Sequence, residues 1–124
     1  MKNLDYGVIG NCMSAALVSK NGSIDWCCLP DFGSSSVFAR ILDSGKGGTF
    51  GFECDPEYKI DQKYIPSTNI LVTRFEKGED RFEIIDFMPR YHFEEGGHYA
   101  PPVIILYYLQ FLACYKSLPH WKER

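Results

Sequence analysis

The chain has 124 residues, of which 45% are hydrophobic, 15% aromatic and 23% charged, and its formal net charge is -3 at pH 7. This length predicts one domain with a moderate hydrophobic core. The 13 basic residues are scattered, which argues against a nucleic-acid partner, because a phosphate-binding groove needs clustered positive charge.

The beginning of the chain has no apolar core and no small-residue cleavage site, so it predicts no signal peptide and a cytoplasmic location. In that compartment the five cysteines are expected to remain reduced thiols. The three histidines have no metal-ligand spacing, and we therefore expect neither a metal nor another cofactor.

The first predicted elements are strands at residues 6–12 and 14–19, followed by a third strand at residues 24–28. Asn21-Gly22 lies between the second and third strands. This dipeptide is typical of a two-residue type I′ turn, whose central residues both need a positive φ. The pattern therefore predicts a β-hairpin.

The strand after this turn is expected to alternate its side chains between two faces. Ile24, Trp26 and Cys28 fall on one face, and Asp25 and Cys27 fall on the other. We interpret Trp26 as a core residue and the two neighbouring cysteines as unreactive thiols.

A short helix is predicted after this strand. Pro30 ends the strand because it has no N–H to donate to a neighbour. The serines of residues 34–36 are suitable N-cap residues, and residues 37–42 would form about a turn and a half of helix. Glycines end the helix within residues 45–48, and residues 49–53 resume as a strand.

The second half of the chain predicts a strand at residues 58–65 and a hairpin formed by residues 68–75 and 81–87. The turn of this hairpin is charged and contains glycine, as expected for a solvent-exposed loop. Within each arm of the hairpin, alternate side chains share a face. They are Leu71, Thr73 and Phe75 on the first arm, and Phe82, Ile84 and Asp86 on the second.

Residues 103–115 are almost wholly apolar. The segment is too short to cross a bilayer, which needs about 20 apolar residues, so we expect a buried strand and no membrane partner. Together these elements predict an all-β fold, an antiparallel β-sandwich with one short helix.

Two local patterns resemble functional motifs but lack the necessary context. Gly45-Lys46-Gly47-Gly48 precedes a strand rather than opening a helix, so we interpret it as a turn and not as a phosphate-binding loop. The serines of residues 34–36 have no nucleophile elbow around them, and helix capping is the better interpretation.

The loop after Trp26 is the strongest candidate for a functional site. It contains Pro30, Asp31 and Phe32, and aromatic rings beside a carboxylate are suited to binding sugars. Glycosidase catalysis needs two carboxylates, and no pair is singled out by its spacing. The residues alone leave two alternatives open for Asp31 and Phe32, namely ligand contact and turn formation.

The stretch YGVIGNCMSAALVSKNGSIDWCCLPDFGSSSVFARILDSGKGGTFGF, with TNILVTRFE, DFMPR and APP after it, resembles the N-terminal domain of glycoside hydrolase family 15. This family contains prokaryotic glucoamylases and related trehalases. The resemblance covers about residues 4–105, with several separated motifs in the same order. The chain departs from the family at residues 33–36, where Gly-Ser-Ser-Ser replaces Asp-Ser-Pro-Ser, and in the apolar segment and tail after residue 105.

The resemblance implies a supersandwich-like β domain over residues 1–105, which is incomplete because the match ends partway through it. Residues 106–124 form a divergent C-terminal strand and tail. The resemblance also implies that both catalytic glutamates of an inverting mechanism lie in an (α/α)6 barrel, which this chain lacks. Trp26, Pro30 and Asp31, together with Phe32, would contact that barrel or the substrate.

We therefore expect a non-catalytic N-terminal domain or fragment of a glucoamylase- or trehalase-like enzyme. It has the catalytic barrel as its partner, no catalytic residue of its own, and no activity alone. Two alternatives stay open. A stand-alone carbohydrate-binding module would bind a gluco-oligosaccharide through Trp26, Asp31 and Phe32. An oligomeric structural protein would self-associate through residues 103–115.

Overall fold

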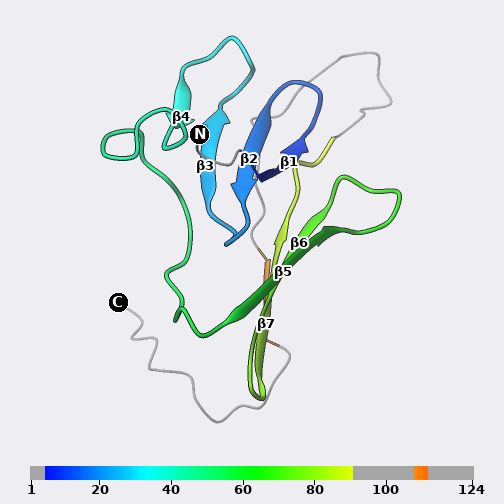
Figure 1. Cartoon of the computed structure of the whole chain (residues 1–124). Coiled ribbons are helices and arrows are strands. Elements are labelled where there is room, and N and C mark those ends of the chain that lie inside the picture. The colour runs from blue at the N-terminus through cyan, green and yellow to red at the C-terminus, as the bar shows by residue number, and fades with distance from the viewer. Residues whose placement is uncertain (1–4, 91–107, 112–124) are drawn as a thin grey trace, which may run out of the picture.

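The computed structural model describes residues 5–90 and 108–111 of the chain. They form two four-stranded antiparallel sheets, which confirms the predicted all-β sandwich (Figure 1). The predicted domain boundary at residue 105 lies outside the described residues. The strands are β1 (Tyr6–Gly10), β2 (Ala15–Ser19), β3 (Ile24–Cys28), β4 (Ser36–Phe38), β5 (Lys59–Tyr64), β6 (Leu71–Lys77), β7 (Asp80–Asp86) and β8 (Tyr108–Phe111).

The first sheet has the order β1-β2-β3-β4. β2 and β3 form the predicted hairpin, but its loop has a different geometry. The Ser19 N–H donates to the Ser23 carbonyl (2.8 Å), and the Gly22 N–H donates to the Ser19 carbonyl (2.9 Å). Gly22 has a positive φ of 77° and Asn21 does not, so the predicted type I′ turn is wrong. The loop is the three-residue kind that ends with a glycine in the left-handed region.

A β-bulge in β3 decides which of its side chains reach the core. The register against β2 shifts so that Asp25 is an extra residue between Ile24 and Trp26. Ile24 and Cys27 therefore lie on the same buried face, whereas Trp26 lies on the opposite face and is half-buried. The predicted alternation, with Ile24 and Trp26 on one face, is wrong for this reason.

The predicted helix at residues 37–42 is also wrong, and the described part of the chain contains no helix. Ser36–Phe38 is the edge strand β4, which pairs with β3 so that Phe38 lies opposite Cys27. The following residues form a turn, in which the Asp43 N–H donates to the Ala39 carbonyl (3.1 Å). A turn and a half is too short to form a stable helix by itself, so pairing with β3 prevails.

The glycine-rich stretch that follows is a turn, as its sequence predicts. Asp43 Oδ1 accepts hydrogen bonds from the backbone N–H groups of Gly45 (2.8 Å) and Lys46 (3.0 Å). These N–H groups are thus occupied by a carboxylate of the chain itself. The strand predicted at residues 49–53 is reduced to an isolated bridge at Phe50.

The second sheet has the order β5-β6-β7-β8. β6 and β7 form the predicted hairpin around Gly78, which has a positive φ of 61°. The shared faces of its arms are confirmed, because the predicted inner side chains are buried or half-buried. β8 falls within the predicted strand at residues 103–115, most of which lies outside the described residues. The buried members of the inner face are Leu71, Thr73, Phe75, Ile84 and Asp86.

Side chains from both sheets form the core between them. The β2–β3 loop approaches the second sheet so closely that a Cβ atom at Gly22 would meet Ile84 Cδ1 at 3.1 Å. At the edge of the sandwich, the Tyr64 hydroxyl contacts both the N–H and the carbonyl of Val8 (2.7 Å each). No helix able to span a bilayer occurs in the described part. The core cluster contains Ile9, Ala16, Val18, Ile24, Cys27, Leu71 and Met88.

Candidate functional site

The loop between β3 and β4 contains three of the four predicted site residues, Pro30, Asp31 and Phe32. The peptide bond before Pro30 is cis. Asp31 Oδ1 accepts hydrogen bonds from the Gly33 N–H (2.8 Å) and the Ser34 hydroxyl (3.1 Å). The Asp31 carboxylate therefore fixes the turn of its own loop, which is the structural alternative that the sequence left open.

Phe32 and Met13 form an exposed apolar pair at one end of the first sheet. The Phe32 side chain is 58% exposed, and its backbone N–H donates to the Met13 carbonyl (3.0 Å). Met13 is 41% exposed, and Asn11 Oδ1 accepts a hydrogen bond from its N–H (3.0 Å). Two hydrogen-bonded loops thus present large apolar side chains to solvent, an arrangement suited to a protein contact.

Trp26, the fourth predicted site residue, lies on the outward face of the first sheet rather than in the loop. It pairs with Leu17 of β2, and it is not part of the core cluster. The interpretation of Trp26 as a core residue is therefore wrong. In the described part of the chain, no hydrogen bond or ring contact joins Trp26 to Asp31 or Phe32.

Asp25 is the centre of a hydrogen-bond network that the sequence did not predict. Its Oδ1 accepts from the hydroxyls of Ser23 (2.9 Å) and Thr49 (2.6 Å), and its Oδ2 accepts from the Tyr6 hydroxyl (3.0 Å). Burial and this hydrogen bond raise the pKa of the Tyr6 hydroxyl. Asp25 is 6% exposed, so its carboxylate holds the bulge in place and is not available to a substrate.

Asp86 is a buried acid for which the described residues provide no hydrogen-bond partner. It ends β7, has no exposed surface, and neither carboxyl oxygen has a hydrogen-bond partner in the described residues. Burial raises the pKa of this carboxyl to about 7. Leu71 lies opposite it on β6, and Ile84 precedes it on the same face. The Asp86 carboxyl is therefore inaccessible to solvent and to any sugar.

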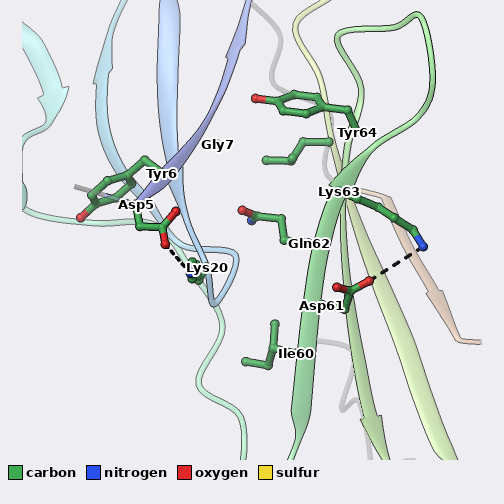
Figure 2. Close-up of a pocket in the computed structure, with 10 residues that line it drawn as sticks. Asp5, Tyr6, Gly7, Lys20, Ile60, Asp61, Gln62, Lys63 and Tyr64 are labelled. Atoms are coloured by element: carbon green, nitrogen blue, oxygen red, sulfur yellow. Dashed lines mark ion pairs between the residues drawn. The ribbon is translucent and has the colours of Figure 1, made fainter. Parts of the chain in front are cut away.

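A cleft of about 340 Å³ opens between β1 and β5 (Figure 2). Ile60, Gln62 and Tyr64 point from β5 toward β1, whereas Asp61 and Lys63 point away and pair with each other at 3.8 Å. Gln62 Nε2 donates to one acceptor in each sheet (2.9 Å each). The hydrogen bonds of the Gln62 amide and the Tyr64 hydroxyl therefore serve to join the two sheets.

The described cysteines are free thiols, as expected. Cys27 is fully buried, and this burial, together with the neighbouring Cys28, raises its pKa to about 11. The Cys27 thiol is therefore protonated and unreactive at neutral pH. Within residues 5–90 and 108–111, no cluster of three metal-ligating side chains occurs.

The class of protein follows from comparison with known families. The family described as "Trehalase-like, N-terminal" matches residues 5–98. The match includes all seven strands from β1 to β7 and the loop that carries Phe32. The chain therefore belongs to this family of trehalase-like N-terminal domains, which confirms the resemblance found in its sequence.

Individual relatives of the chain are proteins named trehalases. The trehalase of Thermoplasma volcanium is 49% identical over 87 residues, which cover 68% of this chain and 14% of that protein. The trehalase of Thermoplasma acidophilum is 50% identical over 76 residues (59% and 13%), and trehalase 2 of Sulfolobus acidocaldarius is 40% identical over 86 residues (69% and 14%). The chain thus spans 13–14% of the length of these relatives. No solved structure matches it.

Proposed function

We propose that the chain acts as the non-catalytic N-terminal β-sandwich of an inverting α-glucoside hydrolase of the trehalase or glucoamylase type. In this role it supports a catalytic (α/α)6 barrel. The observation that carries the proposal is the match of residues 5–98 to trehalase-like N-terminal domains. The relatives are named trehalases, and their name indicates α-linked glucosides such as trehalose as the substrate class.

The environment of three acids supports a role without chemistry. An inverting glycosidase needs a carboxylic acid and a carboxylate about 6.5–9.5 Å apart on either side of the sugar. The Asp25 carboxylate accepts hydrogen bonds from three hydroxyl groups, and the Asp31 carboxylate fixes the turn of its own loop. Asp86 is enclosed in the interior. All three are thus structural or inaccessible.

The loop with Pro30, Asp31 and Phe32 is the proposed contact with the barrel, close to the substrate pocket. The exposed Phe32 ring supports this assignment, since it lies in a loop whose conformation is fixed by hydrogen bonds to the Asp31 carboxylate. Burying the exposed part of such a ring contributes about 1–2 kcal/mol to an interface.

The experiment that tests the proposal is glucose release by the purified 124-residue chain from trehalose and from maltotetraose. We expect none above buffer, with the Thermoplasma volcanium trehalase as the positive control on trehalose. Release that co-elutes with the chain and is lost in Asp31→Asn would overturn the proposal, because the chemistry would then lie in the loop. Saturable sugar binding without release, lost in Phe32→Ala, would favour a carbohydrate-binding module instead.

A further inference from the structure

The outward face of the first sheet carries a row of apolar side chains that crosses three strands. Val8 of β1 lies opposite Leu17 of β2, and Leu17 lies opposite Trp26 of β3. Directly opposed residues share a face of the sheet, so these three side chains are neighbours. Val8 is 47% exposed, and Leu17 and Trp26 are half-buried.

The adjacent row of the same strands faces the core. Ile9 lies opposite Ala16, and Ala16 lies opposite Cys27. None of these three residues has any exposed surface. The first sheet therefore carries an apolar row on both faces, although the second sheet covers only one of them.

The outward face of the second sheet mixes ion pairs with an apolar pair, because Val72 lies opposite Ile85 and both are half-buried. Arg74 pairs with Glu83 at 2.6 Å, and Arg81 approaches Glu76 at 4.0 Å, in both cases across β6 and β7. Antiparallel sheets with one wet face usually show this alternation of apolar and polar residues. Within β1, β2 and β3, by contrast, no ion pair joins residues of neighbouring strands.

Charge is almost absent from the first sheet. β1 and β2 contain no charged residue, and the charged residue of β3, Asp25, is bound by three hydroxyl groups. The Asp5–Lys20 ion pair lies just beyond the ends of β1 and β2, so charge borders the apolar row without entering it. An apolar row with charge only at its border is typical of a surface that another part of a protein covers.

The β1 edge of this sheet is closed, so a partner on that side has to pack on the face of the sheet. The Tyr64 hydroxyl occupies both the N–H and the carbonyl of Val8, and the Asn69 amide donates to the Gly10 carbonyl. An added strand would have to displace both side chains from β1. Packing across the row formed by Val8, Leu17 and Trp26 requires no such displacement.

We propose that this row is the surface against which the polypeptide beyond the matched region packs in trehalase-like enzymes. The inference rests on the proposed function and names the surface through which the domain is held. The length of the relatives argues for this occupant, because the matched region is 14% of the Thermoplasma volcanium trehalase and the other 86% lies outside it. The covering surface has to be apolar, since a charge facing Leu17 would be buried without a partner.

The test compares the effect of the same substitutions on the melting temperature of two proteins. One setting is the 124-residue chain, and the other is a chimera of the Thermoplasma volcanium trehalase in which residues 5–98 of this chain replace the matched region. The double variant Val8→Thr/Leu17→Thr removes apolar character from the row but keeps residues that suit a strand. Leu42→Thr, at a position that is 79% exposed, is the matched control.

We expect the double variant to lower the melting temperature of the chimera by roughly 2 °C or more, and that of the chain by less than half as much. Leu42→Thr should change neither. An equal shift in both settings would mean that the row supports the fold of the domain itself, and no shift in either would mean that the face stays in water. Both results would overturn the inference.

Two further results would count against the polypeptide beyond the matched region as the partner of this row. A chain that is dimeric in sedimentation, and monomeric in the double variant, would assign the face to a second copy. A chimera that fails to fold with the row intact would show that the face does not match the remainder of a trehalase. Trehalose hydrolysis by the unsubstituted chimera tests the proposed function separately, because it does not depend on these substitutions.

Discussion

Replacing Asp86 by asparagine should remove most of the dependence of stability on pH between about pH 4 and pH 7. The carboxyl is fully buried and unpartnered among the described residues, and burial raises its pKa from 3.8 to about 7. The folded chain therefore holds a proton that the unfolded chain has lost in this interval. The contribution of the Asp86 carboxyl to the free energy of unfolding is fully present below about pH 3.8 and is lost as the pH rises through about 7.

The size of the effect follows from the difference between the two pKa values. Each pH unit corresponds to about 1.4 kcal/mol, so the interval from 3.8 to about 7 amounts to about 4 kcal/mol in the free energy of unfolding. That is a large share of the stability of a small domain. Asparagine has nearly the same shape and does not ionise. Asp86→Asn should match the wild type near pH 4 and exceed its stability near pH 7.5.

The assay is urea unfolding followed by far-ultraviolet circular dichroism, at intervals from about pH 4 to about pH 7.5. Asp61→Asn is the control, because Asp61 is an exposed strand residue that points away from the protein interior. The wild type and the control should lose stability as the pH rises, and Asp86→Asn should stay nearly level. Parallel pH profiles for the wild type and Asp86→Asn would refute the reasoning.

Three other predictions concern the loop, the sheet edge and the thiols. Gly22→Ala should lower the free energy of unfolding by about 1–2 kcal/mol in urea titrations, because its φ of 77° suits glycine and its Cβ would crowd the second sheet. Tyr64→Phe should cost about 1 kcal/mol in the same assay, since the hydrogen bonds to Val8 are lost, and an unchanged value would mean that water replaces them. In the folded chain at pH 8, a thiol reagent should modify the exposed Cys12 quickly and the buried Cys27 only at the rate of unfolding, and comparable rates would contradict the burial.

The hairpin of β6 and β7 could be predicted in detail because its strands follow simple alternation. Leu71 and Phe75 lie on the inner face with Ile84, as the pattern indicates, and the charged residues that form ion pairs across β6 and β7 lie on the outer face. Asp86 was placed correctly on the inner face. That the described residues leave it without a hydrogen-bond partner was not predictable from sequence, since an acid at the end of a strand is normally hydrated or paired.

β3 could not be predicted by alternation because an extra residue interrupts it. The bulge at Asp25 is held by hydroxyl groups of Tyr6 and Thr49, which are 19 and 24 residues away in the sequence. Such contacts leave no local signal, so Trp26 was assigned to the wrong face. The error matters for function, because the outward position of Trp26 makes the sheet face a candidate surface.

The strand β4 was mistaken for a helix for a related reason. Ser36–Phe38 follows serines that suit a helix N-cap, and its local sequence fits either structure. Pairing with Cys27 and Cys28 of β3 decides in favour of the strand. Pairing with β3 therefore outweighs the local preference for a helix, as is usual for short segments.

We propose that the chain acts as a support domain without chemistry of its own. The most direct test is glucose release from trehalose, measured in parallel for the chimera with the Thermoplasma volcanium trehalase and for the 124-residue chain. This role predicts release by the chimera and none by the chain. A folded but inactive chimera, or glucose release by the chain alone, would contradict it.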